Sequence, residues 1–208
     1  MLPPALRHYS AADFSGVLLV HGQPGGTIYF TGGKVAACET PGAPGPEVIL
    51  VHSRRIAAAD WGAARTAATA GGQSLTIELI RRGLLGAGEA EALLRTTLAD
   101  AMFALVSGQV DAWAEAPPAR CLLPLTPAVR PGWLLAEAAR RAQVLASFAE
   151  PAAPATPAEP GEPGEPSARA DERRAARELA FTSGRGLYAT MLCLARARAG
   201  RSGSPATR

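Results

Sequence analysis

The stretch FSGVLLVHGQPGGTIYFTGGKVAACE, residues 14–39, decides the first part of the fold. It holds three short runs rich in β-branched, aromatic and aliphatic residues: Phe14–His21, Thr27–Thr31 and Lys34–Glu39. Runs of this length and composition predict strands. Gln23-Pro24-Gly25-Gly26 predicts the first turn, and Gly32-Gly33 predicts a tight hairpin of the primed type. The stretch therefore predicts a three-stranded antiparallel meander.

From Val48 to Leu105 the hydrophobic period becomes helical, and a weak repeat occurs at an offset of 29 residues. Leu50–Trp61 (LVHSRRIAAADW) aligns with Leu79–Ala90 (LIRRGLLGAGEA). Each copy has an apolar helix end, a basic turn, an apolar pair, a spacer of small residues, an acid and the start of a second helix. The repeat predicts a duplicated helical hairpin. At the turn, Arg54 of the first copy corresponds to Gly83 of the second.

The segments that follow extend this body. Residues 89–108 predict a long helix with a core-facing stripe of Leu93, Leu94, Leu98, Met102 and Leu105. Residues 109–115 predict a short strand that returns to the sheet edge, and residues 132–148 predict an amphipathic helix just after Pro131. The predicted fold class is α+β: a small antiparallel meander packed on duplicated helical hairpins, then a disordered proline-rich linker and a C-terminal helix-turn-helix-like pair.

This fold predicts six parts along the chain. Residues 149–170 carry a proline at every third position, which favours a solvated spacer that tethers the last helices to the body. The parts are an N-terminal tail at 1–11, a domain of meander and helical repeats at 12–116, a connecting segment and helix at 117–148, the linker at 149–170, a helix-turn-helix-like segment at 171–199 and a disordered tail at 200–208.

Charge is distributed unevenly. Residues 169–208 hold nine arginines against three acids, a net charge of +6, so the rest of the chain carries −3. A basic segment on a mildly acidic body favours an anionic partner for that segment. The strong preference for arginine over lysine, with Lys34 the single lysine, is typical of a GC-rich genome and weakens any conclusion from arginine counts alone.

The meander and the helical repeats together resemble the PATAN family, a bacterial domain of unknown function. The resemblance rests on G-x-L at Gly16–Leu18, G-x-I-Y-F at Gly26–Phe30, G-K-V-x-A at Gly33–Ala37 and helical repeats of the L-x-x-x-G-L type. It covers residues 12–116. It implies a non-enzymatic interaction module with protein partners in a bacterial signalling system, of the actinobacterial type that ends in a helix-turn-helix-like block. Domains of this family are often encountered near small GTPases and Roadblock-type proteins.

The C-terminal block ERRAARELAFTSGRGLYATMLCLARARAG has the spacing of a helix-turn-helix. Ala180 and Gly184 fit the small residue and the turn that the motif requires, and Leu187, Met191 and Leu194 form an inward stripe. If the block binds DNA, base edges would be contacted by Arg185, Tyr188 and Thr190, and phosphates by Arg173, Arg174 and Arg177. The alternative is an arginine-coated hairpin that docks on protein, and the sequence leaves both open.

Other chemistry has weaker signals. The glycine pairs lack P-loop spacing, so a phosphate-binding loop is not predicted. His8, His21 and His52 are far apart and lack a metal-binding arrangement. We therefore predict no cofactor, no metal site and no enzymatic activity. Cys38, Cys121 and Cys193 are isolated, which is typical of a reducing cytoplasm. No apolar leader or membrane span is expected. Arg81 and Arg82 leave cyclic-dinucleotide sensing as a further alternative.

The leading prediction is a cytoplasmic adaptor that binds protein partners through its body, with DNA contact through its C-terminal segment left open. The DNA-reading regulator is the runner-up, and a helix-turn-helix would favour a homodimer. The candidate interface residues are Trp61, Trp113 and Trp133, the last at the start of its helix.

Overall fold

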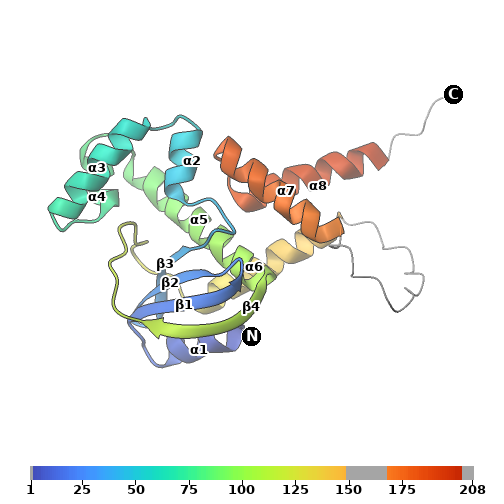
Figure 1. The fold of residues 1–208 in the computed structure, drawn as a ribbon, viewed down its shortest axis with the longest axis horizontal. Helices are drawn as coiled ribbons and strands as arrows, with labels where there is room; N and C mark the ends of the chain where they lie inside the picture. Colours follow the sequence, from blue (N-terminus) through green and yellow to red (C-terminus); the bar gives the residue numbers. More distant parts are fainter. Residues whose placement is uncertain (1, 149–167, 203–208) are drawn as a thin grey trace.

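The computed structural model describes residues 2–148 and 168–202 (Figure 1). The elements found there are α1 Leu2–Ala11, β1 Gly16–Gln23, β2 Gly26–Thr31, β3 Lys34–Glu39, α2 Pro46–His52, α3 Ala58–Ala70, α4 Leu75–Arg81, α5 Ala87–Ser107, β4 Gln109–Ala116, α6 Pro131–Ala146, α7 Ala168–Ser183 and α8 Leu187–Ser202. The α+β class is therefore confirmed.

The sheet has the order β3-β2-β1-β4 and is antiparallel throughout. Its first three strands are the predicted meander. Gly32 and Gly33 have φ of +51° and +68°, the left-handed conformation that a primed hairpin needs at both central residues. β4 pairs with the free edge of β1, as predicted for residues 109–115.

The main core lies between one face of the sheet and α5. It is formed by the strand side chains Leu18, Val20, Ile28 and Phe30, the α5 stripe of Leu94, Leu98, Met102 and Leu105, and Leu134 of α6. Figure 1 shows α5 as the long helix that runs from the helical repeats past the sheet. The first part of α5 packs with the helical repeats and the rest packs on the sheet. This helix therefore fixes the position of the repeats relative to the sheet.

The predicted N-terminal tail is wrong, because residues 2–11 form α1 and contribute to this core. Leu2 and Leu6, one helical turn apart, are almost completely buried. Asp13 then adopts a left-handed conformation, and the Phe14 amide donates to the Tyr9 carbonyl, which closes the C-terminus of the helix. Tyr9 also packs on Phe14 and Phe30, so α1 is an integral part of the sheet layer.

The two helical repeats have the same geometry at corresponding positions. Arg54 and Gly83 have φ of +60° and +68°, so both end their helix in the left-handed conformation. Ile56 and Leu85, the next corresponding pair, are buried in one common cluster. The duplicated hairpin predicted from the offset is therefore present as α2–α3 and α4–α5.

Arg54 adopts a left-handed conformation, which costs a residue with a Cβ about 1–2 kcal/mol. Glycine avoids this cost, and the extra backbone entropy that glycine loses on folding is smaller, about 0.5–1 kcal/mol. We expect Arg54→Gly to raise the free energy of unfolding by about 0.5–1 kcal/mol. Urea denaturation of the full chain measures this. A loss of stability would contradict the left-handed assignment at this turn.

Two predicted boundaries change. The predicted linker falls mostly on residues 149–167, which lie outside the described residues, and its last three positions belong to α7. α8 continues to Ser202, so the predicted tail at 200–208 begins too early and its remainder also lies outside the described residues. Across 2–148 and 168–202, the helices are all too short or too polar to span a bilayer.

Candidate functional site

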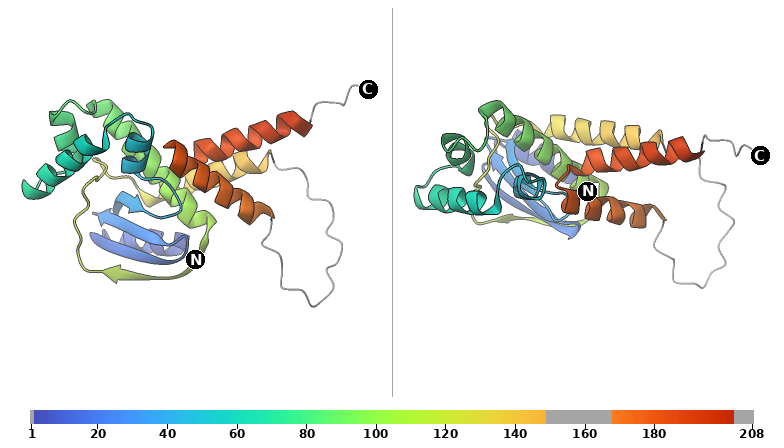
Figure 2. Two further views of the ribbon diagram at one scale, coloured as in Figure 1. Left: turned by 45° about the horizontal axis from the view of Figure 1, so that its top comes forward. Right: turned by 90° about the horizontal axis from the view of Figure 1, so that it is seen from above.

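α7 and α8 form the predicted helix–turn–helix shape, joined by Gly184-Arg185-Gly186. Ala180 is fully buried, and the Arg185 amide donates to its carbonyl, so the predicted role of the Ala180–Gly184 spacing in the turn is confirmed. The pair does not stand apart from the body. Figure 2 shows α8 running beside α6, and α7 also contacts α2. The prediction of a merely tethered pair is therefore wrong.

The turn of the pair rests on the end of α2. Gly184 has φ of +62°, and a Cβ placed there would lie 2.5 Å from the Ser53 nitrogen and 3.0 Å from the Ile49 carbonyl oxygen. His52 Nδ1 lies 2.7 Å from the Phe181 carbonyl oxygen. Glycine is thus required at residue 184 both by the conformation and by the close backbone approach.

A buried ion pair lies where α8 meets the body. Asp100 of α5 and Arg141 of α6 are 1% and 6% exposed, and Arg141 Nη1 donates to Asp100 Oδ1 at 2.5 Å. Arg141 Nε also donates to Glu137 Oε1 at 2.8 Å. Hydrogen bonds from Arg140 and Arg141 hold the pKa of Glu137 at about 2. Arg141 therefore links two carboxylates on two helices.

α8 completes this site. The Arg141 guanidinium lies 4.8 Å from the centre of the Tyr188 ring, and Tyr188 also packs edge-on against Phe103. The Leu187 and Tyr188 amides lie close enough to the Asp100 carboxylate to lower its pKa, although Asp100 Oδ2 accepts no hydrogen bond of regular geometry. Burial raises the pKa of Asp100 by more than the nearby Arg141 and the two amides lower it, so the pKa is raised overall. We call Asp100, Glu137, Arg141 and Tyr188 the charged junction.

The charged junction changes the assignment of the predicted base-reading residues. Tyr188 faces α5 and α6, and Thr190 is buried with its hydroxyl donating to the Gly186 carbonyl. The DNA-binding alternative assigned both to base edges, and this assignment is wrong for the docked pair, because the start of α8 is turned toward Asp100. Arg185 alone of the three is exposed.

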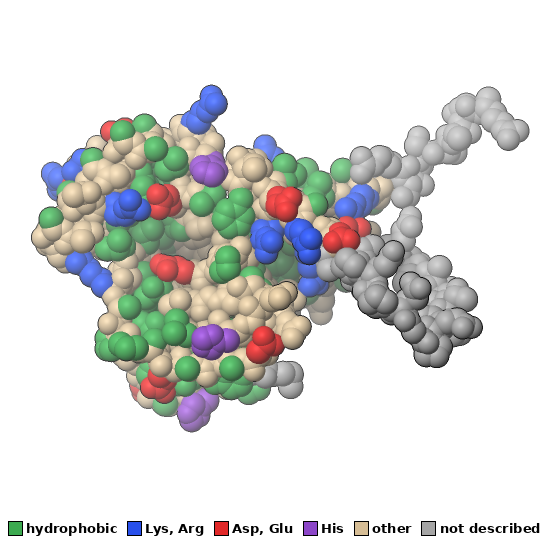
Figure 3. Space-filling model, viewed as in Figure 1, with side chains coloured by type: hydrophobic (Ala, Val, Ile, Leu, Met, Phe, Trp, Pro, Cys, Tyr) green, Lys and Arg blue, Asp and Glu red, His purple; other side chains and the backbone are tan. Residues whose placement is uncertain are grey.

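The predicted phosphate contacts gather on α7, where Figure 3 shows basic side chains along the helix. Arg173, Arg174 and Arg177 line a cavity of about 510 Å³ between α7 and the end of α5. Arg173 Nη1 donates to the Ser107 carbonyl at 2.9 Å. Within the described residues, Arg174 and Arg177 have no ion-pair partner. The structure thus brings these three together, separately from Tyr188 and Thr190.

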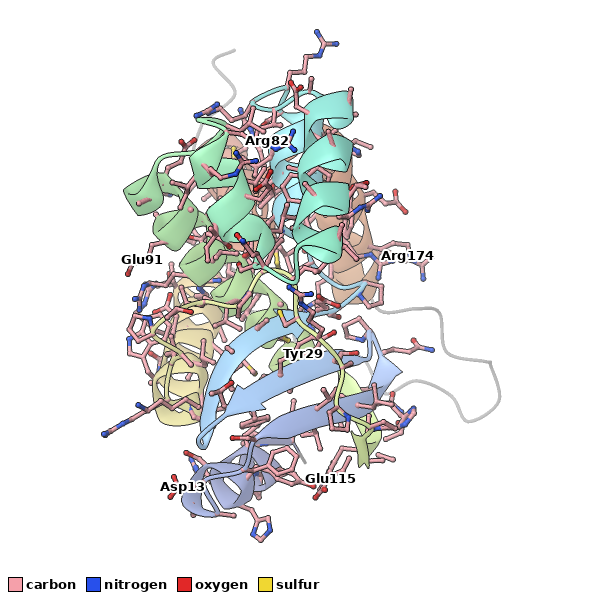
Figure 4. All side chains as sticks on the ribbon, turned by 90° about the vertical axis from the view of Figure 1, so that its left-hand side faces the viewer. Asp13, Tyr29, Arg82, Glu91, Glu115 and Arg174 are labelled. Carbon is pink, nitrogen blue, oxygen red and sulfur yellow. The ribbon has the colours of Figure 1, made fainter. Side chains whose placement is uncertain are left out.

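Arg81 and Arg82, the residues considered for nucleotide phosphates, are already occupied. Both donate to the carboxylate of Glu78 at 2.6–2.8 Å, and these hydrogen bonds hold the pKa of Glu78 at about 2. Figure 4 shows that Arg82 and Arg174 lie on different parts of the molecule. In the first repeat, the residue that corresponds to Glu78 is Ile49 of α2, and the α7–α8 turn packs against this part of α2.

The three tryptophans have different environments. Trp61 is 2% exposed and belongs to the core of the repeats, so the prediction that it lies in a partner interface is wrong. Trp113 on β4 and Trp133 on α6 are 38% and 44% exposed, but neither has a second large exposed apolar residue on its own element. Ile77 and Ile80, by contrast, are 55% and 37% exposed and lie one helical turn apart on α4.

The charged junction and the exposed isoleucines were not predicted from the sequence. Asp100 was visible as the one acid inside the apolar run Leu98–Val106, and Arg141 as a cation in an amphipathic helix. Neither signal identifies its partner, because the two residues are 41 positions apart. Across the described ranges, no three His, Cys, Asp or Glu side chains gather in a way that could hold a metal ion.

Comparison of the chain with models of known protein families, with curated proteins and with solved structures gave no match.

Proposed function

We propose that the chain is a cytoplasmic, non-enzymatic adaptor of bacterial signalling that binds a partner protein through α4 of its helical repeats. The observation that carries the proposal is the exposure of Ile77 and Ile80 on one face of α4. Residues at i and i+3 are neighbours on a helix surface. We call Ile77 and Ile80 the α4 stripe.

The surroundings of the α4 stripe match the anatomy of a protein interface. An interface has an apolar centre, a polar rim and a preference for arginine. Arg81 lies on the same helix face and is oriented by its hydrogen bonds to Glu78. Exposed apolar residues that occur singly are normal on a protein surface, whereas a large contiguous apolar patch marks an interaction site.

The other candidates have less support. A DNA-reading helix-turn-helix would require the start of α8 to leave the charged junction, where Tyr188 contacts Arg141 and Phe103. Cyclic-dinucleotide binding at Arg81 and Arg82 would require both to release Glu78. The α4 stripe needs neither rearrangement, so it favours the adaptor.

We expect Ile77→Asp to weaken partner binding by about 2–4 kcal/mol, the range of an interface hot spot, without loss of fold. Ile77 is the third residue of α4, where a negative charge interacts favourably with the helix dipole. Quantitative affinity purification from the source bacterium measures the recovery of each co-purifying protein with the wild-type chain and with this variant.

Leu179→Asp is the matched control, because Leu179 on α7 is similarly exposed (47%) and lies far from α4 in the sequence. The adaptor proposal predicts a protein retained by the wild-type chain and by the control but lost with Ile77→Asp. Equal recovery of every protein by both variants would contradict it.

A further inference from the structure

A second site lies beneath α7, away from the α4 stripe. The cavity of about 510 Å³ is bordered by the end of α5, the β1–β2 turn and α7. A smaller cavity of about 260 Å³ lies between α6, α7 and α8. Phe103, Ser107, Arg173 and Met191 line both. The two cavities are therefore adjacent and share one wall.

The charge of the larger cavity has one sign. Three arginines line it, and no carboxylate does among the described residues. Two of these arginines, Arg174 and Arg177, have no ion-pair partner in the described part of the chain, whereas Arg81 and Arg141 each bind a carboxylate. Unpaired guanidinium groups in a concave site favour a carboxylate or phosphate group.

The smaller cavity is mainly apolar. Leu145, Phe148 and Leu194 line it together with the shared Phe103 and Met191. Its charged side chains are Arg173, which also donates to the end of α5, and Glu172 and Arg198, which pair with each other at 2.6 Å. An apolar chain placed there would lie mainly against apolar side chains, with the Arg173 guanidinium at the wall shared with the larger cavity.

We propose that the two cavities form one binding site for an anionic amphiphile, a single alkyl chain that ends in a carboxylate or phosphate. The head group would bind Arg174 and Arg177, and the chain would pass Arg173 and Met191 into the apolar cavity. Cavities of about 300–1,000 Å³ with apolar walls and a few converging polar groups are typical of small-molecule sites. Bound there, the ligand would contact α5, α6, α7 and α8 and would stabilise the docked helix pair.

Isothermal titration calorimetry of the full chain with decanoate and with dodecyl phosphate, both below their micelle concentrations, tests the site. We expect saturable one-to-one binding, weakened about tenfold or more by Arg174→Gln combined with Arg177→Gln. Met191→Trp, which fills the shared wall, should weaken binding of the long chain and leave the melting temperature near that of the wild-type chain. Arg196→Gln, an exposed arginine on α8, is the control and should not change affinity.

Three results would overturn the proposal. The first is affinity for inorganic phosphate equal to that for dodecyl phosphate, because the alkyl chain would then contribute nothing. The second is binding to anionic vesicles without binding to the monomeric amphiphile, which would indicate a membrane-surface contact. The third is salt-sensitive binding to duplex DNA that displaces the amphiphile and is lost in the same double-arginine variant. None of these results bears on the α4 stripe, so the adaptor proposal is tested separately.

Discussion

Replacing Arg141 with Met is expected to lower the free energy of unfolding by about 3–5 kcal/mol, the largest effect predicted for a single side chain here. The substitution keeps an unbranched side chain against Tyr188 but leaves the Asp100 carboxylate buried without its cation. An unpaired buried charge costs far more than the net value of the ion pair itself. Chemical denaturation of the full chain at neutral pH measures the loss.

The pH dependence gives this prediction a second test. Without Arg141, burial raises the pKa of Asp100 further above its unfolded value, so the folded variant prefers the protonated acid. A raised carboxyl pKa has no cost below the unfolded-state pKa; its penalty on folding grows as the pH rises above that value and is complete once the pH exceeds the folded-state pKa. The deficit relative to the wild-type chain should therefore shrink as the pH falls toward about 4.

Asp100→Asn in the Arg141→Met background is the control, because it removes the unpaired charge and keeps the shape of the side chain. We expect this double variant to recover most of the lost stability. A deficit that stays constant with pH and in the double variant would contradict a buried ion pair at the charged junction.

Replacing Gly184 with Ala is expected to destabilise the docked helix pair by about 2–4 kcal/mol, since it combines left-handed strain with overpacking. The new methyl group would meet the backbone of Ile49, His52 and Ser53 at 2.5–3.0 Å, and a backbone cannot rotate away as a side chain can. Because the contact joins α7–α8 to α2, the pair should open before the rest of the chain unfolds. Amide exchange resolved by segment measures this order.

Gly83→Ala is a closely matched control. Its φ is +68° against +62° for Gly184, but a Cβ at residue 83 would meet nothing within 4 Å. In this variant the free energy of unfolding should fall only by the cost of a left-handed alanine, about 1–2 kcal/mol. The helices α7 and α8 should stay docked. Equal losses in the two variants, with no opening of the helix pair, would contradict the packing of Gly184 on α2.

The local parts of the fold were predictable because their signals lie within a few residues of each other. The Gly32-Gly33 hairpin and the strand at residues 109–115 follow from turn chemistry and alternation, and the repeat offset located both left-handed turns. α1 was missed because Pro3 and Pro4 are typical of an irregular start. A helix tolerates proline in its first turn, and Leu2 and Leu6 were the available signal.

The relation of the helix pair to the body could not be predicted in the same way. Its contacts join residues far apart in the sequence, such as His52 with Phe181 across 129 positions, and no local pattern specifies such a pairing. The helix-turn-helix spacing and the basic charge left a DNA-reading unit and a protein-docking hairpin both open. The details that favour docking are Gly184 facing the backbone of α2 and Asp100 of α5 lying against the start of α8, and both depend on the assembled fold.

α7 and α8 are part of the body and are held there by the charged junction. Hydrogen–deuterium exchange of the full chain measures this docking at the amides of residues 191–194, which lie one turn beyond Tyr188 in α8. The docked arrangement predicts exchange at least about a hundredfold slower than in an unstructured peptide, with protection that falls in Arg141→Met while α5 stays protected. Exchange of these amides at nearly the unstructured rate in the wild-type chain, with α5 protected, would show an undocked pair and contradict the claim.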